Sequence, residues 1–288
     1  MSGLLGKLSA SSPWLDPVAD VLEKLASPLL GEHGPQAVKD LLYGTWVGHP
    51  LHPFMTDVTL GAMTTSLALD VLGEERGADM ALKLGVLSSG VTALSGAAQW
   101  YDATNNEEPR RLGALHAELN SLALGFYVAS WILRDRDSRT AGIATAWIGH
   151  ALSHTSGYIG GHLAYVLGIG VDRTVNIDAV EEWSDTGVQA SDLSHGEVKR
   201  VEIDDVPVMI LKDHTAIYAA SPVCTHLAGP LDEGKVDGSC VECPWHGSVF
   251  DVTNGKVVHG PATSSLPIYE IRVVSGQVQV RTRPEDRG

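Results

Sequence analysis

Two short runs near the end of this 288-residue chain carry side chains that bind metal. The first reads Cys224-x-His226. The second, separated from His226 by sixteen residues, reads Cys243-x-x-His246. Two thiolates and two imidazoles on tight loops can hold a 2Fe-2S cluster, with the cysteines on one iron and the histidines on the other. The same residue types can also form a tetrahedral zinc site. We favour the iron–sulfur cluster, and therefore an electron carrier.

The sequence around these runs, CTHLAGPL followed by CPWHGSVFDVTNGKVVHGPA, resembles the Rieske ferredoxin family. The resemblance covers about residues 195–283. It implies that Cys224 and Cys243 bind the inner iron, while His226 and His246 bind the outer iron near solvent. It also implies an electron-transfer protein of the oxidoreductase type whose partners are redox proteins.

Three positions depart from the quinol-oxidising members of that family, in which a disulfide joins the two cluster loops. Gly229 and Trp245 stand where those proteins have the two cysteines, and Phe250 stands where they have a tyrosine that donates to a cysteine sulfur. A serine donor is retained as Ser248. Fewer donors stabilise the reduced cluster less, so we expect a low, ferredoxin-like potential. The third cysteine, Cys240, is interpreted as a buried thiol.

Around the two runs, short apolar segments alternate with turn residues, as in a protein made of short strands. β-Branched runs separated by Asp, Gly and Ser turns predict strands at residues 198–203, 206–211, 215–220, 268–274 and 278–280. These strands indicate an all-β sandwich, which we place at residues 197–283. Three further histidines are expected on solvated turns rather than as ligands: His195, His214 and His259.

The first part of the chain contains long uncharged segments. No Asp, Glu, Lys or Arg occurs for thirty-two residues between Arg139 and Asp172, more than the roughly twenty that cross a bilayer. Its uncharged segments are rich in Gly, Ala, Ser and Thr, which suits closely packed membrane helices. We predict an α-helical four-helix membrane bundle in residues 46–172, with helices near 54–73, 79–101, 113–133 and 140–170. A soluble four-helix bundle is the alternative.

Two segments flank this bundle. Residues 1–45 are predicted to be an amphipathic segment that lies on the membrane surface or caps the bundle, because apolar residues recur at helical spacing from Trp14 to Leu25. Residues 173–196 are acidic and are predicted to be a linker. The run LLYGTWVGHPLHP at 41–53 resembles the start of a bacterial four-transmembrane-helix family of unknown function. That resemblance implies a Rieske domain fused to a membrane bundle. Because the family has no assigned activity, the resemblance says nothing about what the bundle does.

Histidines gather in the predicted bundle. If its helices alternate in direction, His49, His52, His116 and His162 lie near one membrane face, the face to which an even number of spans returns the chain. Three interpretations stay open for this possible second site. It binds haem or another metal, it forms a quinone pocket, or its hydrogen bonds only hold the helices together.

The formal net charge of −15 argues against partners that are nucleic acids or anionic lipid headgroups. The three cysteines indicate no structural disulfide, and no export signal is recognised, so we expect the Rieske domain on the cytoplasmic face of the plasma membrane. We predict a membrane-tethered protein that transfers single electrons between a membrane partner and a soluble partner. The alternatives, both without a cofactor in the bundle, are an anchored ferredoxin that feeds a reductase or oxygenase, and a redox sensor.

Overall fold

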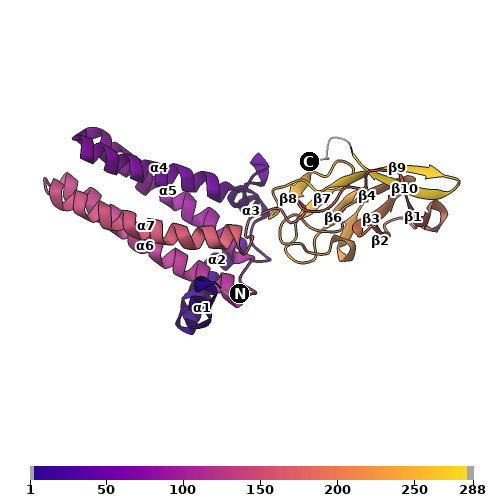
Figure 1. Ribbon diagram of the computed structural model, residues 1–288, viewed down its shortest axis with the longest axis horizontal. Coiled ribbons are helices and arrows are strands. Elements are labelled where there is room, and N and C mark those ends of the chain that lie inside the picture. Colours follow the sequence, from indigo (N-terminus) through magenta and orange to yellow (C-terminus); the bar gives the residue numbers. More distant parts are fainter. Residues whose placement is uncertain (1–2, 284–288) are drawn as a thin grey trace. The chain divides into compact units, whose positions relative to one another are not determined.

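The structure is a computed structural model that describes residues 3–283 (Figure 1). The chain divides into two compact units. The helical unit holds the residues up to Leu42 and Pro50–Ile169, and the strand unit holds Tyr43–His49 and the chain from Gly170 onward. This agrees with the predicted order of a helical domain followed by an all-β domain.

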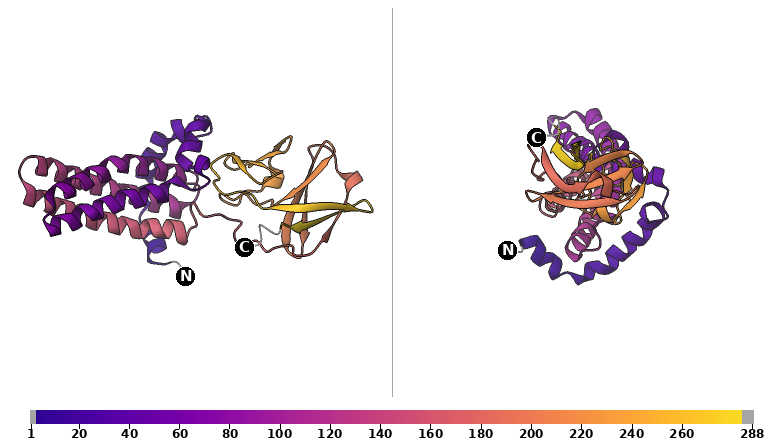
Figure 2. Two further views of the ribbon diagram at one scale, coloured as in Figure 1. Left: turned by 90° about the horizontal axis from the view of Figure 1, so that it is seen from above. Right: turned by 90° about the vertical axis from the view of Figure 1, so that its right-hand side faces the viewer.

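Four long helices form the body of the helical unit: α4 (Leu51–Leu72), α5 (Glu75–Tyr101), α6 (Glu107–Asp135) and α7 (Arg139–Tyr165). They run alongside one another in Figure 1 and in the left view of Figure 2. Their positions agree with the four predicted helices. Within residues 3–283, α5 is the one helix whose length and composition would allow it to cross a membrane.

Small residues let these helices pack closely. Met63 of α4, Leu82 of α5, Tyr127 of α6 and Ala146 of α7 are buried together in one apolar cluster. A Cβ atom at Gly85 of α5 would lie 2.7 Å from the sulfur of Met63. A methyl group at that position would have to displace the end of the buried Met63 side chain from its place in the core.

A buried group of charges joins all four helices. Asp70 of α4 and Arg134 of α6 form a bidentate pair with O–N distances of 2.5 and 2.9 Å, and each side chain is 1% exposed. Asp79 of α5 lies 3.0 Å from Arg134, and Arg139 of α7 lies 2.7 Å from Asp70. Two positive and two negative charges therefore meet, and their mutual pairing offsets the cost of removing each from water.

The N-terminal part of the helical unit packs onto α5 and α6. It contains α1 (Leu4–Ala10), the short 3₁₀ turn η1 (Pro13–Leu15), α2 (Asp16–Leu30) and α3 (Gln36–Tyr43). A second 3₁₀ turn, η2 (Thr45–Val47), belongs to the strand unit. Ala19 of α2 is buried against Trp100 and Ala114. Arg111 of α6 donates to both carboxylate oxygens of Asp16, at 2.7 and 2.9 Å. Capping the bundle is one of the two roles predicted for this segment.

The strand unit contains two antiparallel sheets (Figure 1). The six-stranded sheet has the order β1-β10-β9-β4-β3-β2 and consists of β1 (Ser184–Gln189), β2 (Val198–Ile203), β3 (Val206–Asp213), β4 (Ala216–Ala220), β9 (Ile268–Val274) and β10 (Gln277–Thr282). The four-stranded sheet follows chain order and consists of β5 (Lys235–Asp237), β6 (Cys240–Glu242), β7 (Val249–Asp251) and β8 (Val257–His259). The five predicted strands are all present in the larger sheet.

Strand β1 differs from the prediction, because it lies inside residues 173–196, which the sequence analysis placed in a linker. Ser184 pairs with Val280 of β10, and Val188 is buried. Its sequence, SDTGVQ, has one β-branched apolar residue, and Gly187 has a φ of 71°. Such a polar, irregular edge strand carries too weak a pattern to be recognised. The connection from α7 to β1 is residues 166–183.

Candidate iron–sulfur site

The two ligand-bearing loops share one backbone construction. In each, the N–H of the cysteine donates to the carbonyl five residues later, at 2.9 Å for Cys224 and 2.8 Å for Cys243. The carbonyl of each cysteine accepts the N–H four residues later, at 3.0 Å. That fourth residue, Ala228 or Gly247, has a φ of 61° or 74°. The left-handed backbone suits Gly247 and strains Ala228, which has a Cβ atom.

The structure brings the four predicted ligands together. Cys224 and Cys243 are 1% and 2% exposed, and their thiols are hydrogen-bonded to each other. The rings of His226 and His246 are half-buried and meet edge to face, with centroids 5.2 Å apart. Buried thiols and less buried imidazoles form the donor set that a Rieske cluster requires, one pair for each iron. These residues therefore fit a 2Fe-2S cluster.

The protonation of this donor set favours metal binding. The hydrogen bond from the Cys224 thiol lowers the pKa of Cys243 to about 6, and the main-chain N–H groups of Trp245 and His246 act in the same direction. The same bond raises the pKa of Cys224. Burial, together with the nearby His246, lowers the pKa of His226 to about 3. A thiolate and a neutral imidazole are the forms that bind iron.

Ser248 supports the inner part of the site. Its hydroxyl is fully buried and donates to the thiol of Cys224. Its Oγ accepts the N–H of Ala262 at 3.0 Å, which fixes the direction of the hydroxyl. Sequence reasoning identified Ser248 but missed Ala262, because a main-chain donor leaves no mark in the residue type.

Phe250 lies in the apolar core that also contains Cys224 and Cys243, and it is fully buried. We expect Phe250→Tyr to raise the reduction potential by adding a donor near a cysteine sulfur. If the new hydrogen bond stabilises the reduced cluster by about 1 kcal/mol more than the oxidised cluster, the reduction potential rises by roughly 40 mV for one electron. Redox titration of the EPR signal measures the change, with Phe250→Leu as the control that adds no hydroxyl. An unchanged potential in a folded Phe250→Tyr variant would contradict the expectation.

Gly229 and Trp245 lie against each other at the cluster loops. A Cβ atom at Gly229 would lie 2.6 Å from the sulfur of Cys243 and 3.2 Å from the indole ring of Trp245. The indole itself is largely exposed. Any side chain at 229 would therefore displace a candidate ligand, which explains why this position holds glycine.

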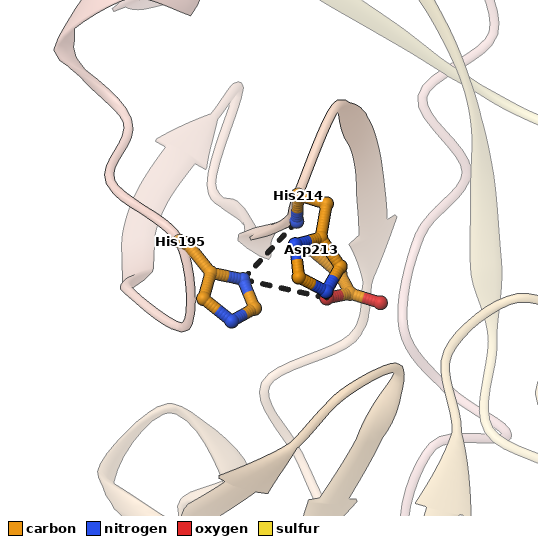
Figure 3. A group of neighbouring side chains, drawn as sticks. All are labelled: His195, Asp213 and His214. Atoms are coloured by element: carbon orange, nitrogen blue, oxygen red, sulfur yellow. Dashed lines mark hydrogen bonds and ion pairs between the residues drawn. The ribbon is translucent and has the colours of Figure 1, made fainter.

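A second group of metal-binding residue types lies on turns of the strand unit (Figure 3). His195 Nδ1 lies 3.4 Å from Asp213 Oδ1 and accepts the main-chain N–H of His214 at 3.1 Å. The two imidazoles stack with centroids 4.4 Å apart. Both histidines are exposed, as predicted. His259 is exposed as well, but it is the last residue of strand β8 and does not lie on a turn. Because His195 Nδ1 already accepts a hydrogen bond, we assign no metal to this group.

The histidines of the helical unit differ in their partners. His52 Nδ1 donates to the carbonyl of Thr92 at 2.9 Å, and His116 Nδ1 donates to the carbonyl of Ser156 at 2.9 Å. His162 Nε2 lies 3.4 Å from Glu108, and His49, which is exposed, belongs to the strand unit. His52 and His116 are close enough for their charges to interact. That all four histidines form one second site remains a prediction.

Comparison with known proteins connects this geometry to a family. The profile of the Rieske [2Fe-2S] domain matches residues 186–270. Ferredoxin CarAc of Metapseudomonas resinovorans is 36% identical over 92 residues, which are 32% of this chain and 86% of the ferredoxin. The chain belongs to the Rieske [2Fe-2S] family. The Rieske domain therefore carries a 2Fe-2S cluster and transfers electrons.

Two further similarities concern this domain. The anthranilate 1,2-dioxygenase ferredoxin subunit of Burkholderia cepacia is 35% identical over 74 residues, which are 26% of this chain and 68% of the subunit. The solved ferredoxin of carbazole 1,9a-dioxygenase from Nocardioides aromaticivorans IC177 is 26% identical, with a TM-score of 0.34, and covers 36% of this chain and 100% of its own.

Most of the helical unit matches a different family. Residues 48–173 match the profile of the family described as a predicted membrane protein (DUF2231). This confirms the fusion expected from the sequence, in which a Rieske domain follows a domain of a predicted membrane protein family.

Proposed function

We propose that this protein is a membrane-tethered Rieske iron–sulfur protein that passes single electrons between a redox partner in the membrane and a soluble redox partner. In this proposal Cys224 and Cys243 hold the inner iron, and His226 and His246 hold the outer iron. The observation that carries it is the pairing of buried thiols with less buried imidazoles, in a chain that also matches a predicted membrane protein family.

The cluster, when bound, accepts one electron and gives it back. The protein's own residues decide where that electron enters and leaves. The cysteines are sealed in the apolar core, so the histidine side is the shorter route to a partner. The exposed Trp245 ring stands edge to face with His246, with centroids 6.4 Å apart, and adds an aromatic contact surface beside this route.

For the helical unit we propose four transmembrane helices in the plasma membrane, with the Rieske domain on the cytoplasmic face. Histidines among these helices would form a second redox site for haem or quinone, because ionisable side chains inside a membrane bundle usually mark a functional site. His52 and His116, the two with matching main-chain hydrogen bonds, support this proposal most directly.

A second candidate function is a plain anchored ferredoxin whose helices hold no cofactor. It is favoured by the curated relatives, one of which is named as the ferredoxin subunit of anthranilate 1,2-dioxygenase. In this case the soluble partner would be an oxygenase or a reductase, and the bundle would only keep the Rieske domain at the membrane.

Electron exchange with membrane quinone tests the first function. The full-length protein is placed in liposomes with quinone, its cluster is reduced, and the EPR signal is followed as the cluster is reoxidised. We expect His116→Ala and His162→Ala to slow the exchange at least about tenfold while the cluster spectrum stays unchanged, because one redox step has lost its site. Exposed His154→Ala serves as the control.

The structural role gives a different result. If the histidines only join helices, the same variants should unfold at lower temperature, because each leaves a polar partner unpaired. A folded variant that lacks both His116 and His162, and exchanges electrons at the unaltered rate, would overturn the membrane redox function and leave the anchored ferredoxin.

A further inference from the structure

The four long helices contain an internal repeat. The sequences of the two helix-turn-helix units, α4–α5 and α6–α7, align without a gap. Residues at equivalent positions differ in number by 64. Leu, His, Gly, Ser and Tyr residues recur in the two copies: Leu51 and Leu115, His52 and His116, Leu60 and Leu124, Gly61 and Gly125, Ser66 and Ser130, Leu69 and Leu133, Gly85 and Gly149, Ser89 and Ser153, Gly96 and Gly160, Tyr101 and Tyr165.

The contacts repeat with the sequence. His52 donates to the carbonyl forty residues later, and so does His116. A Cβ atom at Gly96 would lie 2.7 Å from the His52 ring, and one at Gly160 would lie 2.9 Å from the His116 ring. Each imidazole therefore donates to one carbonyl and packs against one glycine of the neighbouring helix, and Ser156 Oγ also lies 2.8 Å from His116 Nδ1. Two equivalent contacts at equivalent positions indicate a pseudo-twofold relation between the two halves of the bundle.

Two equivalent residues contact each other at the pseudo-twofold axis that relates the two halves. Asp70 of α4 and Arg134 of α6 occupy matching positions in the two copies and bind each other directly. His52 and His116 each precede them by eighteen residues. Eighteen residues are five turns, so each histidine points to the same side of its helix as its charged partner, about 27 Å further along. The two imidazoles therefore occupy equivalent positions on α4 and α6, on the side of each helix that carries Asp70 or Arg134.

The hydrogen bonds also determine which nitrogen each histidine offers. A carbonyl can only accept, so Nδ1 carries the proton in both rings, and Nε2 keeps its lone pair in the neutral form. The amide nitrogen of Asn120 lies 3.1 Å from His116 Nε2, which agrees with a bare lone pair there. Histidines that bind metal usually donate their other ring nitrogen to a main-chain carbonyl or a carboxylate in this way.

We propose that His52 and His116 are the two axial ligands of a b-type haem on the pseudo-twofold axis of the bundle. This rests on the proposed membrane redox function and names its cofactor and its site. Haem iron takes two axial nitrogens from opposite faces, as two symmetric imidazoles supply. Iron would replace Asn120 at His116 Nε2. A quinone in its oxidised form has only acceptor oxygens, so two bare Nε2 atoms offer it no hydrogen-bond donor.

Optical and EPR spectra of the full-length protein test the site. The protein is purified in detergent from cells supplied with a haem precursor, and haem is measured as the pyridine complex. We expect about one haem per chain with the spectrum of bis-imidazole iron, lost in His52→Ala and in His116→Ala. Exposed His154→Ala should keep it. His116→Gly should regain the spectrum when imidazole is added, which a folding defect would prevent.

The glycines supply variants that leave both ligands in place. Gly96→Ala and Gly160→Ala should shift the haem spectrum or lower its occupancy at least about twofold, because the new methyl group pushes the imidazole. Gly90→Ala and Gly157→Ala face open space and should have no effect.

Two results would overturn the haem site: haem-free protein from haem-replete cells, or full haem in a variant lacking both histidines. The Rieske EPR signal, recorded on the same samples, separates the two proposals. An intact cluster signal without haem removes only the haem site. Haem without a cluster signal would instead remove the proposed electron transfer through the Rieske domain.

Discussion

Cys224→Ser and Cys243→Ser are expected to abolish iron binding, whereas Cys240→Ser should retain iron in nearly stoichiometric amount. Both proposed ligands are buried, and their thiols contact each other. Cys240 lies in β6 opposite Asp251 of β7. Cys240 is the first residue of strand β6 and lies outside the two loops that supply the four proposed ligands, so a serine there leaves the donor set intact. Iron and sulfide content, together with EPR, measure the outcome.

The comparison is meaningful only if the variants fold. Far-ultraviolet circular dichroism of each purified variant provides that control, because it reports the helix and strand content separately from the iron content. Loss of iron from Cys240→Ser with an unchanged dichroism spectrum would mean that a ligand has been misassigned.

The second large effect is expected in the helical unit. Arg134→Gln should destabilise it by about 3–5 kcal/mol, because Asp70 would remain as an uncompensated charge that is 1% exposed. Arg139 still binds Asp70 at 2.7 Å, which sets the effect below the full cost of an isolated charge. Denaturant unfolding of the full-length protein in detergent, followed by circular dichroism, gives the free energy of unfolding.

Two further variants complete this test. Arg136→Gln removes an exposed arginine two residues along the chain and should change stability by less than about 0.5 kcal/mol. Asp70→Asn combined with Arg134→Gln removes both charges of the pair and should recover part of the loss. Equal stability of Arg134→Gln and Arg136→Gln would show that the charge pair contributes nothing.

Much of this architecture could be predicted because its patterns are local. The cluster ligands lie in two short runs, and the strands from Val198 to Ala220 alternate clearly between turns. The four helices follow from long uncharged segments. Each pattern occupies one short window of sequence, so residue type and spacing suffice to recognise it.

Other features depend on contacts between distant residues, which a linear pattern does not record. Strand β1 is polar and exists because β10 pairs with it. The main-chain donor of Ala262 has no side-chain signal, and the pairing of Asp70 with Arg134 joins residues sixty-four positions apart.

The ion pair between Asp70 and Arg134 has an evolutionary consequence. If the two helical hairpins descend from one duplicated gene, an ancestral dimer would have placed identical residues opposite each other on its axis. Opposite charges at these positions now favour one hairpin of each kind and disfavour two of the same kind, since a homotypic pair would bury two like charges. The divergence of a single pair of sites thus commits the duplicated halves to remain in one polypeptide.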